Sequence, residues 1–416
     1  MKKVIEFSRS KIIISLITLS VFFFVTCIDE SPEKKEAVTI PESTINRQDF
    51  AGSASCASCH KDIYQSHLTT AHALTSRLAS AESIAGSFEA GQNMHSYNSN
   101  VLVAMEKRDS GFFQVEYVNG VQKRSKRFDI SIGSGTMGQS FLTWDEQGRL
   151  FQLPITFFSA ANQWSNSPGF ANKPTFNRVI TSRCLECHTT FAQTLSLPKK
   201  EPEQFNRNNM ILGVECEKCH GPAASHVAFQ TSNPTDTTGK NIVNPATLSR
   251  QQNLDLCALC HGGRLQKTKP SFEFVVGEEL HDFFKIDTAT TDPNEIDVHG
   301  NQYGLLRASE CFRMSEMTCK SCHNTHQNEK NKPVLFSQRC MSCHTVQQKN
   351  FCTFKDLPST TLIKNCIDCH MPQKPSRAIS VFVSGQQTPM SALIRSHYVA
   401  KYPDETKKFM NSFRKK

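Results

Sequence analysis

Hydrophobic residues make up only 38% of this 416-residue chain. That share is lean for a globular protein with an ordinary side-chain core. Material other than aliphatic side chains must therefore fill part of the interior. The apolar run at residues 12–26 is also short for a membrane-spanning helix.

The N-terminus has the pattern of a secretory signal. Four basic residues precede the apolar run, which stops at Cys27. A basic head followed by a short apolar stretch is typical of a signal peptide, here residues 1–26. Its end resembles a bacterial lipoprotein cleavage site, so we expect lipidation of Cys27 and a polar tether over residues 27–50. Ordinary signal cleavage and a single uncleaved anchor helix stay open as alternatives.

One five-residue motif, Cys-x-x-Cys-His, occurs seven times, and its copies are numbered motif 1 to motif 7 in chain order. Fourteen of the 17 cysteines belong to these copies. The motif residues are Cys56, Cys59 and His60; Cys184, Cys187 and His188; Cys216, Cys219 and His220; Cys257, Cys260 and His261; Cys319, Cys322 and His323; Cys340, Cys343 and His344; and Cys366, Cys369 and His370.

The spacing of the motif indicates covalently attached haem. Two cysteines three residues apart lie on one face of a helical turn, so both thiols reach the vinyl groups of one porphyrin. The histidine that follows then points at the iron as its proximal ligand. Zinc sites use paired cysteines too, but they do not require a histidine directly after every second cysteine. The sequence therefore predicts seven haem c groups.

Three cysteines lie outside the motifs. If Cys27 carries lipid, Cys311 and Cys352 are the pair left over in an oxidising compartment. We expect a disulfide between them, and two buried free thiols are the alternative.

Eight histidines remain to supply the distal ligands of the irons. The best candidates, from their positions around the motifs, are His72, His226, His299, His326 and His397, and His67, His95 and His281 are weaker ones. Seven distal histidines would make every haem low-spin and suited to electron transfer alone. If only the best five bind, two irons are left open to substrate.

The chain alternates between haem-bearing and haem-free segments. We expect a first haem segment at residues 51–96, a small antiparallel β module at 97–175, a six-haem domain at 176–400 and a basic tail at 401–416. Apolar spacing predicts a helix over Asp62 to Ser80. The expected fold is mainly α and irregular, packed around haems, with the β module inserted.

Two details of the β module bear on function. Asn119-Gly120 stands between alternating stretches and predicts a hairpin turn. The glycines at 133, 135 and 138 match the dinucleotide fingerprint, but strand-like sequence follows them and no βαβ unit surrounds them. We interpret them as turns and expect neither a nicotinamide nor a flavin cofactor.

Two haem-bearing stretches resemble a known family. Cys56 to His60, with Thr70-Ala71-His72-Ala73 after it, is similar to the opening of the tetrahaem cytochromes c that accept electrons from hydroxylamine oxidoreductase. In that family a histidine in the place of His72 ligates a haem iron, and the block from Glu215 to His226 implies the same role for His226. The chain departs from the family in its three additional motifs, its β module and His67, where tryptophan is usual. The resemblance implies haem c and an extracytoplasmic location and leaves catalysis open, because the wider group includes carriers and reductases.

Together these patterns predict an electron-transfer protein. Six motifs in fewer than two hundred residues force the haems to pack against one another, which makes a path for electrons. Each haem adds two propionates to a formal charge of +9, so binding to nucleic acid is not expected.

We expect a lipoprotein of a Gram-negative cell envelope, periplasmic or on the outer-membrane surface, that serves redox partner proteins. The alternatives are an oxidoreductase acting on a small nitrogen or sulfur oxyanion at a pentacoordinate haem, and a relay that docks its partner through the β module.

Overall fold

The computed structural model describes residues 44–416 except 197–200, 287–291, 349, 415 and 416. The predicted signal peptide, Cys27 and most of the tether lie outside the described residues. The described chain combines short helices with antiparallel sheets, so the predicted mixed α and β fold is confirmed. Within these ranges, no helix has the length and apolar character needed to cross a membrane.

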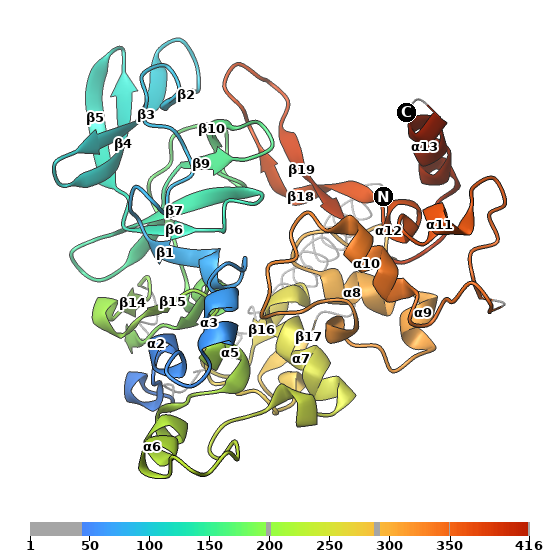
Figure 1. Ribbon diagram of the computed structural model, residues 1–416. Helices are drawn as coiled ribbons and strands as arrows, with labels where there is room; N and C mark the ends of the chain where they lie inside the picture. The colour runs from blue at the N-terminus through green and yellow to red at the C-terminus, as the bar shows by residue number, and fades with distance from the viewer. Residues whose placement is uncertain (1–43, 197–200, 287–291, 349, 415–416) are drawn as a thin grey trace, which may run out of the picture. The chain divides into compact units, whose positions relative to one another are not determined.

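Two antiparallel sheets form the β module, which follows motif 1 (Figure 1). The four-stranded sheet has the order β2 (Met94–Ser96), β3 (Val101–Arg108), β4 (Gly111–Val118) and β5 (Val121–Arg127). The seven-stranded sheet contains β1 (Ser76–Leu78), β6 (Ile130–Ile132), β7 (Gly138–Trp144), β8 (Leu150–Gln152), β9 (Ile155–Phe158), β10 (Gln163–Asn166) and β11 (Arg178–Val179). The strands β1, β2 and β11 come from outside the range 97–175.

The turns of the β module follow their sequence signals. Val118 pairs with Val121, so Asn119 and Gly120 form a two-residue turn, and both have positive φ as a type I′ turn requires. Gly133 and Gly135 also have positive φ and join β6 to its antiparallel neighbour β7. The interpretation as turns is confirmed for Gly133 and Gly135 and is wrong for Gly138, which begins β7.

An aromatic core fills the β module. Trp164 and Phe141 are almost fully buried and pack with Val103 of the four-stranded sheet. The buried Gln114 links the sheets, because its amide donates to Ile155 O at 2.7 Å and accepts from Ile155 N at 3.0 Å. The two sheets are thus held by apolar packing and by one buried amide that both donates and accepts a hydrogen bond.

The predicted helix over Asp62 to Ser80 is wrong beyond its first two turns. The helix α3 (Lys61–His67) ends at His67, and a 3-10 turn, η2 (Ala73–Thr75), follows it. Residues 76–78 then form β1 and pair with β6. Pairing with a neighbouring strand outweighs the local apolar spacing there.

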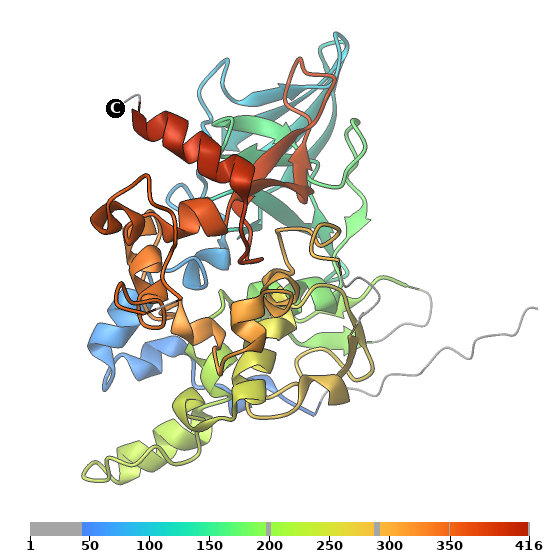
Figure 2. The ribbon, with the colours of Figure 1, turned by 90° about the vertical axis from the view of Figure 1, so that its right-hand side faces the viewer.

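Short helices dominate the haem-bearing part of the chain. They are η1 (Arg47–Asp49), α2 (Ser53–Cys56), α4 (Ser182–His188), η3 (Arg207–Asn209), α5 (Cys216–His220), α6 (Ala224–Ser232), η4 (Pro245–Thr247), α7 (Arg250–His261), η5 (Leu280–Asp282), α8 (Gln302–Arg307), α9 (Glu310–Arg313), η6 (Cys319–Ser321), α10 (Pro333–Cys340), α11 (Ser359–Leu362), α12 (Cys366–His370) and α13 (Pro403–Arg414). The C-terminal helix α13 packs against α12 (Figure 2).

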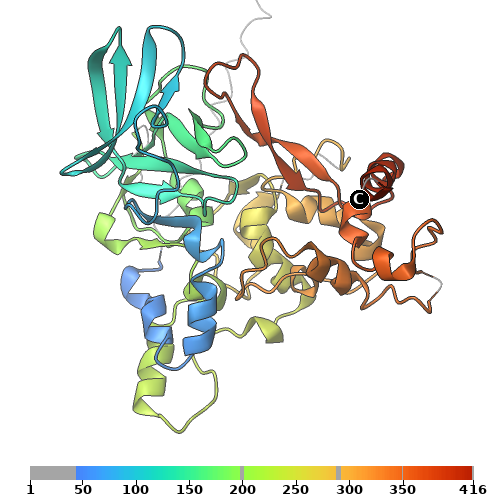
Figure 3. The ribbon, with the colours of Figure 1, turned by 45° about the horizontal axis from the view of Figure 1, so that its top comes forward.

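Four two-stranded sheets also lie in this part, where the sequence suggested only helices and loops. Three are small: β12 (Thr189–Phe191) with β15 (Ile211–Leu212), β13 (Thr194–Ser196) with β14 (Gln204–Phe205), and β16 (Leu265–Lys267) with β17 (Phe284–Ile286). The fourth is the hairpin of β18 (Gln373–Val381) and β19 (Met390–Arg395) (Figure 3). The loop that connects these two strands reaches β10 through a bridge from Val383 to Ser165. This hairpin ties the last motif to the β module.

Candidate haem-binding sites

Each motif lies on or at the end of a helical turn, as haem attachment requires. In motifs 1, 5 and 6 the histidine N–H donates to the carbonyl of the first cysteine, at 2.8, 3.0 and 3.0 Å. Such a bond closes one helical turn and brings both cysteines and the histidine to one side. All fourteen motif cysteines are free thiols in the structure.

Three pairs of histidine rings lie at the separation that one iron requires. The ring centres are 6.1 Å apart for His220 and His326, 6.1 Å for His323 and His397, and 6.3 Å for His72 and His261. Two imidazoles on opposite sides of one iron place their centres about 6 Å apart, because each metal–nitrogen bond is about 2 Å long. The residues therefore fit bis-histidine haems at motifs 3, 4 and 5.

His299 lies near His188, the histidine of motif 2. Burial, and then the nearby charge of His299, lower the pKa of His188 to about 4. Burial likewise lowers the pKa of His72 and of His397 to about 4. These imidazoles stay neutral at physiological pH, which is the form that binds iron.

The candidate ligand histidines line internal space. Burial lowers the pKa of His261, His299 and His323, yet each residue keeps an exposed surface. A side chain that is surrounded by protein and still accessible faces a gap inside the fold. Flat prosthetic groups would fill such gaps, which accounts for the small share of apolar residues.

Hydrogen bonds orient several of the imidazoles. The Nδ1 atoms of His220, His344 and His370 lie 2.9, 2.7 and 2.9 Å from the carbonyl oxygens of residues 243, 350 and 400. His226 has the same arrangement, with Lys240 O at 2.7 Å. A bonded Nδ1–H fixes the tautomer and leaves Nε2 for the metal.

Neighbouring motifs touch through their cysteines. The Cys56 and Cys216 thiols share a hydrogen bond that raises the pKa of the first and lowers that of the second to about 6. The same kind of contact shifts the pKa values of three more sulfur pairs: Cys187 with Cys260, Cys257 with Cys319, and Cys340 with Cys366. Motif 1 therefore adjoins motif 3, motif 4 adjoins motifs 2 and 5, and motif 6 adjoins motif 7.

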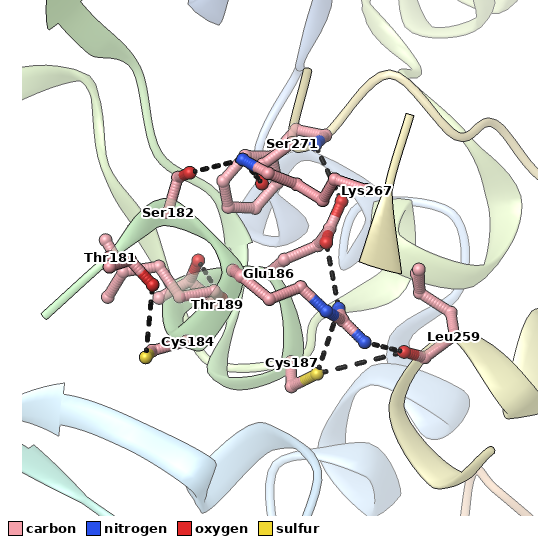
Figure 4. A network of polar contacts seen from close by, with 12 residues as sticks. Thr181, Ser182, Cys184, Glu186, Cys187, Thr189, Leu259, Lys267 and Ser271 are labelled. Atoms are coloured by element: carbon pink, nitrogen blue, oxygen red, sulfur yellow. Dashed lines mark hydrogen bonds and ion pairs between the residues drawn. The ribbon is translucent and has the colours of Figure 1, made fainter. Parts of the chain in front are cut away.

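Figure 4 shows how motif 2 is held against motif 4. Arg183 donates to Glu186 Oε2 at 2.8 Å and to Leu259 O, within motif 4, at 2.7 Å. The buried Glu186 also accepts from the N–H of Phe272 at 2.9 Å. An arginine with two acceptors and a buried carboxylate make this contact rigid.

A buried carboxylate also joins motif 1 to motif 3. Glu217, between the two cysteines of motif 3, accepts the N–H groups of Ala51, Gly52 and Ala223, each at 2.8 Å. Neither Glu217 nor Arg183 stood out in the sequence. A charged residue near a motif cysteine was the only signal, and it does not separate a buried carboxylate from a solvated one.

The remaining candidates occupy other places. His67 lies with Nε2 3.1 Å from Val214 O, and His95 is buried in β2 beside Ser384 Oγ at 3.1 Å. His281 is exposed and pairs with Glu279 and Asp282. The predicted disulfide is not formed, because Cys311 and Cys352 are both free thiols. Cys311 lies near Cys322 and Cys343. Cys352 lies near a different motif cysteine, Cys369.

Comparisons with known proteins agree with this chemistry. Residues 159–221, which include motifs 2 and 3, match the family model "Cytochrome c554 and c-prime". The multiheme cytochrome MtrA of Shewanella baltica strain OS185 is 27% identical over 177 residues, which are 39% of this chain and 51% of MtrA. The chain thus spans about half the length of this curated relative.

A solved structure shares the fold. The outer cell wall cytochrome OcwA superposes with a TM-score of 0.51 at 16% identity, over 86% of this chain and 81% of that one. Together the three matches support a multihaem c-type cytochrome.

Proposed function

We propose that the chain carries seven haem c groups, one at each motif, and conducts electrons between redox partners in the cell envelope. The supporting observation is the set of contacts between motifs. Cysteine sulfurs that lie next to one another in the fold would place the porphyrins attached to them side by side. Such contacts join motif 1 to motif 3, motifs 2 and 5 to motif 4, and motif 6 to motif 7.

Two further cysteine pairs lie near each other and bridge the remaining gaps. Cys219 of motif 3 lies near Cys257 of motif 4, and Cys343 of motif 6 lies near Cys322 of motif 5. The motifs then form one path, in the order 1, 3, 4, 5, 6 and 7, with motif 2 as a side branch at motif 4. A continuous path is what an electron carrier needs.

The location belongs to the same proposal. The basic head, the short apolar run and Cys27 favour export and lipid anchoring of the mature chain. Haem c and the structural likeness to the outer cell wall cytochrome OcwA are in keeping with an envelope protein. A Cys27→Ser variant should lose palmitate labelling and membrane association while keeping its haem content. Membrane association that persists in this variant would refute lipid anchoring.

The test of the path uses a variant that lacks one haem. Replacing Cys257 and Cys260 with alanine removes the attachment points of motif 4, where the path meets its branch. The intact protein should show seven haems per chain by mass spectrometry, and every haem should be reduced in one fast phase by a donor. The variant should hold six haems and leave a slow fraction.

A matched control separates lost conduction from general damage. Cys311→Ala removes a cysteine that belongs to no motif and should leave both the haem count and the fast phase unchanged. Fewer than seven haems in the intact protein would contradict the cofactor assignment. Undiminished fast reduction of all remaining haems in the motif 4 variant would contradict the path.

A further inference from the structure

The position of every histidine in the chain bears on which irons have a distal ligand. All 15 lie in its described part. Seven are the proximal histidines of the motifs. Four of the other eight lie near a proximal imidazole: His72, His299, His326 and His397.

A fifth histidine suits motif 1. His226 is held by its Nδ1 atom against Lys240 O, which leaves Nε2 available. It lies on α6, which packs against η1, the turn that leads into motif 1. This placement makes His226 the candidate distal ligand for the iron of His60.

The last three histidines are engaged elsewhere. The Nε2 atom of His67 contacts Val214 O, which removes it from metal binding. His95 is enclosed in the β module and His281 is paired with acidic residues at the surface. Among the described side chains, no histidine ring stacks at iron-spanning distance on His344 or His370.

Motifs 6 and 7 are nevertheless built like the others. His344 and His370 have their Nδ1 atoms bound to carbonyl oxygens, so both imidazoles are oriented for an iron. The helix α10 packs on α12, and Ile367 N donates to Ser337 Oγ at 3.4 Å between them. These two sites are a contiguous pair at one end of the path.

We infer that the haems of motifs 6 and 7 lack a distal histidine and bind a small exogenous ligand, a diatomic gas or a small anion such as nitrite. The inference rests on the proposed function only in that each motif holds a haem. An open iron coordinates such molecules, whereas a bis-histidine iron does not. The five other haems then deliver electrons to a ligand-binding terminus, or withdraw them from it.

Sulfur ligands are the rival occupants of these positions. Cys311 lies near Cys343, but burial raises the pKa of its thiol, and a neutral thiol is a poor ligand. Cys352 lies near Cys369 and is exposed. The double variant Cys311→Ala and Cys352→Ala removes both sulfurs and so separates the two explanations.

The test counts ligand-binding irons in the intact protein with its haems attached. Carbon monoxide added to the dithionite-reduced protein should bind to about two haems per chain. The ferric protein should show a high-spin signal in electron paramagnetic resonance that nitrite converts to low-spin. The double cysteine variant should give the same two sites.

Variants at single histidines calibrate that count. His397→Ala opens motif 5 and should add a third carbon monoxide site, whereas His95→Ala should add none. A protein with seven haems, no carbon monoxide binding and an all-low-spin spectrum would overturn the inference and leave the proposed function intact. Binding that appears only after both cysteines are replaced would assign the positions to sulfur and overturn it as well.

Discussion

The imidazole rings of His220 and His326 lie 6.1 Å apart, centre to centre, and within 17° of parallel. The first belongs to motif 3 and the second follows motif 5 by three residues. A single iron between them would join two parts of the chain that are more than a hundred residues apart. Binding of the haem at motif 3 and formation of the tertiary structure would therefore depend on each other in this protein.

Replacing His326 should open the iron of motif 3. In His326→Ala the haem stays attached by its two cysteines but loses its distal ligand, so one low-spin haem becomes high-spin. The number of carbon monoxide sites should rise by one relative to the unaltered protein, as measured by optical titration. His281→Ala, which removes an exposed histidine, is the control, and an equal count in both variants would contradict the pairing.

Glu217→Gln should loosen the docking of motif 1 on motif 3. The glutamine keeps one acceptor oxygen and places an amide N–H₂ where Glu217 accepts the N–H groups of the Ala51 segment. Hydrogen bonds to charged groups are worth about 2 kcal/mol each, so we expect a loss near that size in the free energy of unfolding. Denaturant titration measures it, and Glu316→Gln, at a side chain 93% exposed, should change nothing.

Arg183→Met should weaken the contact between motifs 2 and 4. It leaves the buried Glu186 without its cation, and breaking a buried ion pair costs about 3 kcal/mol. Thermal or chemical unfolding should show that loss, and magnetic coupling between the two haems should change. Arg183→Lys keeps the charge and should cost less. Equal stabilities of both variants and the parent would show that the ion pair is unimportant.

Gly86→Ala should destabilise the β module without touching any motif. A Cβ atom at Gly86 would lie 2.1 Å from the ring of the buried Trp164. Forcing a methyl group into a filled core costs about 2 kcal/mol. The expected result is a lower unfolding midpoint with an unchanged haem spectrum, whereas Gly239→Ala, whose nearest neighbour is 3.7 Å away, should behave like the parent.

Local signals were enough to predict part of this architecture. The Asn119-Gly120 turn depends on two residues that tolerate positive φ, and each motif depends on five consecutive positions, so both can be recognised in the sequence. The hairpin β18–β19 was missed because its stability comes from packing on the β module, where Val381 and Val383 meet Phe158. Helix α3 stops early for a similar reason, since β1 finds its partner fifty residues away.

The histidines show the same limit at the candidate sites. The sequence selected His72 and His397 as candidate ligands, but their partners, His261 and His323, are set by the tertiary fold. His67 had a plausible spacing and is instead bound to the carbonyl of Val214. A five-residue motif does not specify which distant histidine will lie opposite its own histidine in the folded chain.

The thiol contacts between motifs constrain how the protein can be made. Cys187 meets Cys260, and Cys56 meets Cys216. In the oxidising cell envelope, where the proposed function places this chain, adjacent thiols would oxidise. A chain that collapsed before modification would trap these sulfurs as disulfides and lose the haem sites for good. Thioether formation removes that hazard, so biogenesis of this cytochrome favours attachment on an extended polypeptide, with compaction as the last step.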